Sequence, residues 1–443
     1  MFSNKDLRKL IIPLVIEQLL AVTIGMADTV MVSSCGEAAV SGISLVDSIN
    51  FLLITLFSSL ATGGAVIASQ YIGRGDHKSA SLAAKQLFYA SLALSAVLGV
   101  IAVFFRKPVL NMVFGSIEAD VMAHAQIYFL LSAISYPFLA VYNAGAALFR
   151  SMGDSRTTML ISILMNTINI VGNAILIYGF QMAAAGAATA SLVSRAVGAI
   201  IITVLLLNPR RIIFYDKLHK PEIHLSMLKS ILQIGVPNGL ENSIFQIGKI
   251  LVASIVSGFG TISITANAVA GNLASLQVIP GMALGMAMIT VVGQCIGAKD
   301  YEAVKKYTKK LMLITYGVVW AMTLLMLLFS KQILSFYSLS EETTTMTMEV
   351  FIVHGICAVI VWPLAFALPN ALRAANDVRF TMIISLISMW IFRIGFSYIL
   401  AIYFNMGILG TWIAMFIDWF CRGACFVIRF ARGKWKNISF IDN

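Results

Sequence analysis

The sequence predicts an all-α integral membrane protein with twelve transmembrane helices. They would form two six-helix bundles related by pseudo-two-fold symmetry along the membrane normal. Three observations predict this fold. The composition is strongly apolar, twelve apolar stretches are long enough to cross a bilayer, and the second half of the chain repeats polar residues of the first half.

The composition excludes several classes of protein. Of the 443 residues, 59% are apolar and 12% are charged, with a mean hydropathy of +0.89. Soluble chains carry about twice that charged fraction, so we exclude a cytosolic enzyme, a disordered protein and a nucleic-acid-binding protein. The five cysteines form no CxxC or Cys/His cluster in the sequence, so they indicate neither a disulfide framework nor a metal site.

Twelve stretches meet the length requirement for a span, which is about 20 mostly apolar residues. The predicted spans are 10–34, 43–70, 85–105, 122–149, 157–178, 182–206, 229–257, 264–294, 307–329, 344–372, 380–402 and 407–430. The longest connection, 207–228, is a predicted cytoplasmic linker. It divides the chain into an N-terminal lobe, 1–206, and a C-terminal lobe, 229–443.

The placement of Lys and Arg predicts the orientation of these spans. With the N-terminus inside, 24 of the 31 basic residues lie in cytoplasmic segments, three lie in outer loops and four lie within spans. Cytoplasmic loops of membrane proteins carry such an excess. We therefore expect a multi-pass protein of the plasma membrane with both termini cytoplasmic, and the net charge of +11 needs no nucleic acid to explain it.

An internal repeat supports the division into two lobes. Polar and special residues recur at an offset of 223 or 224, as in the pairs Pro13/Pro237, Glu17/Glu241, Gln70/Gln294, Asp76/Asp300, Arg150/Arg373, Asp154/Asp377 and Gly172/Gly395. Six spans per repeat make the repeats parallel. This architecture predicts a central cleft and alternating access within one chain, so a monomer would suffice.

Four polar residues are predicted to share one depth in the outer leaflet of the N-terminal lobe. They are Asp28 in the first span, Asn169 and Asn173 in the fifth, and Ser191 in the sixth. An ionisable group inside a membrane is costly and is a functional candidate by default. An oxygen cage with one carboxylate suits Na⁺, or the carboxylate holds a proton instead. The alternative is that Asn and Ser only hydrogen-bond neighbouring helices.

The C-terminal lobe carries a different set of charges at a similar depth. Lys249, Arg393 and Asp418 lie within predicted spans, and an unpaired cation there is costly. We interpret them as a charge-balanced polar network that braces the helices, with substrate contact or gating as the alternative. Positive groups near a cleft also weaken the expectation that every substrate is a lipophilic cation.

Two repeated acids and two repeated prolines lie nearer the cytoplasmic side. Glu17 and Glu241 either pair with basic loop residues or take up protons in the inward-open state. Pro13 and Pro237 should kink their helices because proline removes a backbone donor.

The motifs resemble those of the multidrug and toxic compound extrusion (MATE) family over the whole chain. The resemblance lies in Pro13 with ADTVMVSS around Asp28, in QYIGRGDHKSA echoed by QCIGAKDYEAV, in FRSMGDSRTT echoed by LRAANDVRFT, and in NTINIVGNAILIYG followed by GAATAS. No Walker motif is present in the sequence, so ATP-driven transport by this chain alone is not supported.

The resemblance implies roles for the same outer-leaflet residues. Asp28 matches the span-one acid that the family uses for cation coupling, and Asn169 matches the family's span-five Asn. At Asn173 part of the family carries Asp, and Ser191 stands where Thr is usual. Phe245 stands where one subfamily has a Glu, so a second cation site of that type is not expected.

The sequence therefore predicts a secondary active multidrug efflux antiporter. Inward movement of H⁺ or Na⁺ would drive export of amphipathic or cationic drug-like compounds. Membrane lipid is an expected partner, whereas nucleic acid, a cofactor beyond the coupling ion and enzymatic activity are not expected. The alternatives are a lipid-linked precursor flippase of the same superfamily and, less favoured, a channel or receptor-like membrane protein, with an intramembrane enzyme more remote.

Overall fold

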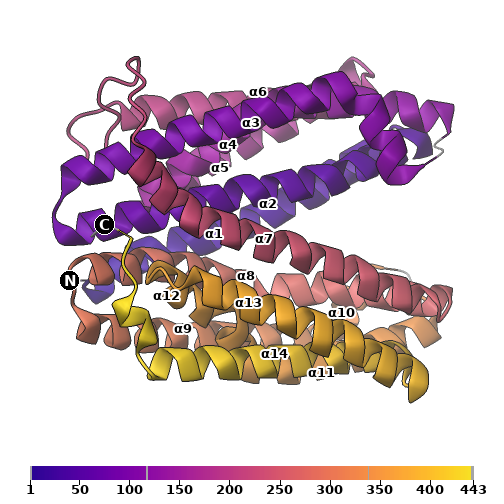
Figure 1. The fold of residues 1–443 in the computed structure, drawn as a ribbon. Helices are drawn as coiled ribbons and strands as arrows, with labels where there is room; N and C mark the ends of the chain where they lie inside the picture. Colours follow the sequence, from indigo (N-terminus) through magenta and orange to yellow (C-terminus); the bar gives the residue numbers. More distant parts are fainter. Residues whose placement is uncertain (1, 116–117, 338, 441–443) are drawn as a thin grey trace. The chain divides into compact units, whose positions relative to one another are not determined.

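In the computed structural model, the residues described are 2–115, 118–337 and 339–440, without the side chains of 24, 26, 27 and 29. Over these ranges the chain is helical (Figure 1). The α-helices are α1 (Asn4–Ser33), α2 (Glu37–Arg74), α3 (His77–Phe114), α4 (Ala119–Ser151), α5 (Ser155–Asn173), α6 (Ala183–Leu206), α7 (Leu225–Ser257), α8 (Thr261–Gly297), α9 (Tyr301–Leu328), α10 (Ser330–Ser335), α11 (Glu341–Trp362), α12 (Leu368–Ala374), α13 (Val378–Ser388) and α14 (Gly407–Ala431). Four π-helical segments, η1 (Ala174–Gly179), η2 (Pro363–Ala367), η3 (Met389–Gly395) and η4 (Tyr398–Tyr403), and one 3₁₀ turn, η5 (Lys434–Asn437), adjoin them.

Most of these helices are long and apolar enough to cross a membrane. Among the described residues eleven helical stretches meet that criterion, and they coincide with the second to twelfth predicted spans. The first predicted span, 10–34, falls in the 30-residue helix α1. The prediction of an all-helical, membrane-spanning chain is confirmed.

The first compact unit is Met1–Gly239. Within it α2 packs against α3 and α4, α4 packs against α6, and α5 packs against both α1 and α6. Gly63 on α2 allows a close approach to the first turns of α7, because a Cβ there would lie 2.5 Å from the carbonyl oxygen of Ile231. Small residues at such contacts are how membrane helices pack closely.

The second compact unit is Leu240–Asn443. Within it α8 packs against α9, α11 and α12, and α14 packs against α11 and the π-helical segments η2, η3 and η4. Its apolar core is rich in aromatic side chains, among them Trp362, Trp412, Phe416 and Trp419. The boundaries predicted for the two lobes and their linker stay a prediction.

The internal repeat is visible in the backbone. Five pairs of residues have a positive φ at equivalent positions of the two halves: Gly36 and Gly260, Gly75 and Lys299, Gly153 and Asn376, Gln181 and Asn405, and Ala183 and Gly407. The segments η1 and η4 also occupy equivalent positions, 174–179 and 398–403. Positive φ is uncommon for residues other than glycine. Its recurrence at Lys299, Asn376 and Asn405 therefore indicates that both halves retain one backbone plan.

The repeated aspartates begin helices. Asp76 accepts a hydrogen bond from the backbone N–H of Ser79 at 3.0 Å, and Asp300 accepts one from Ala303 at 2.9 Å. Each satisfies a backbone donor that has no partner within its helix. The bonds from Ser79 hold the pKa of Asp76 below its usual range, so this cap stays charged.

The two repeated prolines lie inside continuous helices. Pro13 is within α1 and Pro237 within α7. The departure from helical geometry in the unit-1 helix α3 is at Phe105, with φ −106° and ψ 18°, three residues before Pro108. A role for Pro13 and Pro237 as hinges stays a prediction.

Candidate functional site

The structure brings the four predicted outer-leaflet residues together in the first unit. Asn173 Nδ2 donates a hydrogen bond to Asp28 Oδ1 at 2.6 Å. Since a carboxylate only accepts hydrogen bonds, the amide nitrogen of Asn169 faces Asp28, at 2.7 Å from Oδ1 and 3.2 Å from Oδ2. The amide oxygen of Asn169 then accepts from Ser191 Oγ at 3.1 Å. One chain of contacts thus joins α1, α5 and α6.

Local structure explains this convergence. Asn169 and Asn173 are four residues apart on α5, so they lie on the same face of the helix. That face is covered by α1 and α6, and the two side chains belong to residues only 6% and 1% exposed. Asn173 Oδ1 is buried and has no hydrogen-bond partner among the described residues. The site therefore contains a buried oxygen that is available as a ligand.

Two further charged residues lie near Asp28. Asp47 on α2 and Arg195 on α6 are both close enough to interact with Asp28 electrostatically. Asp47 Oδ1 accepts a hydrogen bond from the Tyr128 hydroxyl at 3.0 Å and from Asn50 Nδ2 at 3.2 Å. Asp47 is not among the predicted site residues, although it is an acid inside the predicted span 43–70, which is the same signal that identifies Asp28.

Hydrogen bonds extend from these charges into the core of the first unit. Tyr136, which is fully buried, donates through its hydroxyl to Asn50 Oδ1 at 2.8 Å. Arg195 Nη1 donates to Ser135 Oγ at 2.7 Å. Because Asn50 also bonds Asp47, the charged residues around Asp28 are anchored by side chains of α2 and α4.

Acidic groups outnumber basic groups around Asp28 among the described residues. Two acids, Asp28 and Asp47, interact electrostatically with one guanidinium, that of Arg195. A proton can neutralise Asp28 directly. A sodium ion would need oxygen ligands, which the Asp28 carboxylate, Asn173 Oδ1 and Ser191 Oγ could supply. The donor set thus fits either cation chemically.

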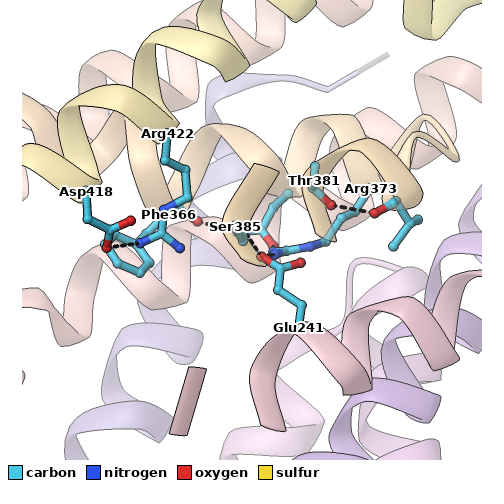
Figure 2. A network of polar contacts seen from close by, with 9 residues as sticks. Glu241, Phe366, Arg373, Thr381, Ser385, Asp418 and Arg422 are labelled. Carbon is cyan, nitrogen blue, oxygen red and sulfur yellow. Dashed lines mark hydrogen bonds and ion pairs between the residues drawn. The ribbon is translucent and has the colours of Figure 1, made fainter. Parts of the chain in front are cut away.

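The two repeated glutamates have basic partners. In the first unit, Glu17 Oε1 lies 3.4 Å from Arg150 Nη1, and Glu17 Oε2 accepts from Thr158 Oγ1 at 2.8 Å. In the second unit, Glu241 Oε1 accepts from Arg373 Nη2 at 2.8 Å and from Ser385 Oγ at 2.6 Å (Figure 2). These are the contacts that the pairing interpretation requires, whereas proton uptake by either acid stays a prediction.

Asp418 in the second unit is fully buried and is shared by two arginines. Arg422 Nη2 donates to Asp418 Oδ2 at 3.3 Å, and Arg393 Nη1 lies 3.9 Å from the same oxygen. Ser388 also donates to Asp418 Oδ1. Arg422 was not part of the predicted network, yet its position four residues after Asp418 on α14 placed both on one helix face.

Lys249 is not joined to this acid. Its Nζ lies 5.2 Å from the centre of the Phe245 ring. Over the described ranges Lys249 makes no ion pair. The structure therefore brings Arg393 and Asp418 of the predicted network together, adds Arg422, and leaves Lys249 without an acidic partner.

The chain is similar to known membrane transporters over most of its length. The MatE family model matches residues 13–175 and 237–399, one stretch in each half. The chain is 27% identical to the uncharacterized transporter YisQ of Bacillus subtilis, covering 96% of this chain and 93% of the relative. It is 26% identical to the probable multidrug resistance protein NorM of Thermotoga maritima, covering 98% and 93%. These matches confirm the resemblance predicted from the motifs.

Solved structures share the fold. A MATE protein crystallised in the bent conformation superposes with a TM-score of 0.88 at 20% identity, covering 97% of this chain and 94% of that one. A multidrug resistance MATE family transporter in an outward-facing conformation gives 0.89 at 20% identity, covering 98% and 97%. The likeness confirms the prediction of two six-helix halves.

Proposed function

Because the chain belongs to the MatE family of membrane transporters, we propose that it is a secondary active efflux antiporter. Inward movement of H⁺ or Na⁺ drives export of amphipathic organic compounds by alternating access. The protein works as a monomer in the plasma membrane, with both termini cytoplasmic. The naming of several relatives as probable multidrug resistance proteins supports small organic substrates.

The convergence of Asp28, Asn169, Asn173 and Ser191 is the observation that carries the proposal. The Asp28 carboxylate accepts hydrogen bonds from two amides of α5. Such bonds are strong because the acceptor is charged. Uptake of a proton or a sodium ion changes that charge, so it changes the contacts between α1 and α5. The state of Asp28 is in this way linked to helix packing, as a coupled transporter requires.

A buried acid that gains or loses charge shifts the balance between two conformations only if its contacts differ between those conformations. The described contacts of Asp28 meet this condition because its two amide partners lie on a different helix. Asp47 and Arg195 affect how strongly Asp28 binds a cation. The positive charge of Arg195 weakens binding of H⁺ or Na⁺ at Asp28, whereas the negative charge of Asp47 strengthens it.

The test is efflux from proteoliposomes loaded with a fluorescent organic dye. An imposed pH gradient is compared with an imposed Na⁺ gradient of equal size, for the wild type and for Asp28→Asn. We expect one of the two gradients to drive efflux by the wild type, which identifies the coupling ion. Asp28→Asn should reconstitute as a folded protein but lose gradient-driven efflux.

Asp120→Asn is the matched control, because Asp120 is an exposed acid in the first turn of α4. It should transport like the wild type. Wild-type rates in Asp28→Asn would rule out the role of Asp28. Failure of both gradients to drive efflux of any dye tried would instead favour the flippase alternative, which transport of a lipid-linked cargo would then test.

A further inference from the structure

Three positive charges of the second unit gather on one aromatic ring. Lys249 Nζ lies 5.2 Å from the centre of the Phe245 ring, Arg393 Cζ lies 5.5 Å from it and Arg422 Cζ lies 5.6 Å from it. These residues come from α7, η3 and α14. Phe245 and Lys249 are four residues apart on α7 and therefore share a face. The three cations thus occupy one small region around Phe245, which we call the cationic cluster.

The cationic cluster has too few anionic partners. Asp418 is the acid that pairs with it among the described residues, and it accepts a hydrogen bond from Arg422 but lies 3.9 Å from Arg393. Lys249 makes no ion pair or hydrogen bond over the described ranges. The Nε atoms of Arg393 and Arg422 are buried and have no hydrogen-bond partner there. Three positive charges therefore face one negative charge.

This imbalance is hard to explain as bracing alone. Cations at membrane depth are costly unless they pair with an acid, contact backbone carbonyls or serve a ligand. A bracing network would place an acceptor against Lys249 and would hydrogen-bond the guanidinium of Arg393 fully. Among the described residues Lys249 instead has no acceptor, and Arg393 keeps a 3.9 Å ion pair with Asp418 but an Nε atom without a hydrogen-bond partner. An anion could satisfy these donors by charge-assisted hydrogen bonds.

Beside the cations lies the aromatic core of the second unit, against which Phe366 packs. Phe366 lies 6.1 Å from Phe245, stacks on Trp362 at 5.4 Å and meets the edge of Trp419 at 5.4 Å, measured between ring centres. Figure 2 shows Arg422 lying over Phe366 and joined to Asp418. Aromatic rings of this kind make offset-stacked or edge-to-face contacts with other rings.

The cluster runs from an accessible residue to buried ones. Lys249 is exposed and Phe245 is partly exposed, whereas Arg393 and Arg422 are 8% and 3% exposed. A ligand could therefore meet Lys249 and Phe245 first, with the arginines behind them.

We propose that the cationic cluster binds the carboxylate of an aromatic organic anion. Lys249 and Arg393 hold the carboxylate, the Phe245 ring contacts the aromatic part, and Asp418 fixes Arg422. Where the ligand is a transported compound, this inference rests on the proposed function and adds organic anions to its substrates. Binding itself does not depend on transport.

Isothermal titration calorimetry on the full chain in phosphatidylcholine nanodiscs tests the proposal. The probes are 1-naphthoate, its neutral isostere 1-naphthamide and the cation 1-naphthylmethylammonium. We expect naphthoate to bind, and both other probes to bind at least about tenfold more weakly, because they lack the anionic acceptor. Equal binding of naphthoate and naphthamide, or no binding of naphthoate, would overturn the proposal.

Lys249→Gln is the diagnostic variant, because Lys249 is exposed and its replacement breaks no ion pair among the described residues. It should weaken naphthoate binding about tenfold and leave naphthamide binding unchanged. Lys331→Gln removes the same charge from an exposed position of α10 and should bind naphthoate like the wild type. Unchanged naphthoate binding in Lys249→Gln would also overturn the proposal.

A second variant, Phe245→Ala, tests the aromatic part of the site. It should weaken naphthoate binding but leave the weaker binding of acetate unchanged, since acetate has no ring to contact Phe245. Equal loss for both anions would contradict contact with the ring. Calorimetry is done without a gradient, so failure of binding here and failure of gradient-driven efflux are observed separately.

Discussion

Neutralising Glu241 should destabilise the protein because Arg373 is then left as a buried charge without its carboxylate. The Glu241 and Arg373 side chains are 8% and 12% exposed and join at 2.8 Å. Removing one partner of a buried ion pair costs about 3–5 kcal/mol. Glu241 Oε2 and Arg373 Nε have no partner among the described residues, so the pair has one contact and not two. We therefore expect the lower value, about 3 kcal/mol, for Glu241→Gln.

A double-mutant cycle separates the pair from other effects. Arg373→Gln should lose a similar amount, because it leaves Glu241 as the uncompensated charge. The double variant has no buried charge at this point and should lose only about 1 kcal/mol, less than either single variant.

The free energy of unfolding can be measured by reversible titration with sodium dodecyl sulfate, followed by tryptophan fluorescence in detergent micelles. Glu349→Gln, at an exposed position of α11, is the control and should stay within about 0.5 kcal/mol of the wild type. If the double variant lost as much free energy of unfolding as the two single variants together, the reasoning would be refuted. Such additivity is what two residues that do not interact would show.

Two further predictions concern packing and capping. Gly63→Ala should destabilise the protein by about 1–3 kcal/mol, because the new Cβ would lie 2.5 Å from the carbonyl oxygen of Ile231. Gly271 has open space around it, so Gly271→Ala should not destabilise the protein. The melting temperatures of the two variants in detergent test this difference. Asp300→Ala should cost about 1 kcal/mol by removing the helix cap on Ala303, and Asp300→Asn should keep most of the stability in the same assay, since Asn also caps.

The helices could be predicted from the sequence because membrane spans are determined by length and hydropathy. Their ends could not. The predicted span 85–105 became α3, His77–Phe114, since a helix continues beyond the bilayer core wherever a cap and amphipathic residues allow it. The cap of α3, Asp76, was recognised as a repeated residue, but its hydrogen bond to Ser79 depends on the backbone after the positive φ of Gly75.

The sequence could predict which side chains meet only when they lie on one face of the same helix or at the same predicted depth in the membrane. Counting residues from the ends of spans placed Asp28 and Asn173 at a common depth, and the structure has them in contact. Depth alone does not say which way a helix is rotated about its axis. That rotation decides whether Asp47 meets Tyr128 and whether Lys249 reaches Asp418. The sequence could therefore predict neither outcome.

The two halves share a backbone plan but differ in charge at their candidate sites. Acids predominate around Asp28 in the first half, and cations predominate around Phe245 in the second. Both keep the same backbone plan and an equivalent Glu–Arg pair, which joins helices in either half. At the positions equivalent to Asp28, Asn169 and Ser191 the second half has Val252, Phe392 and Met415.

These apolar replacements leave the second half unable to hold a cation by the same oxygen atoms. The cations around Phe245 have no equivalent in the first half either, since Gly25 and Ile170 stand at the positions of Lys249 and Arg393. The two halves thus share residues that hold the fold, whereas the polar residues at their candidate sites differ. A coupling ion in one half and an anionic ligand in the other would then bind to different residues.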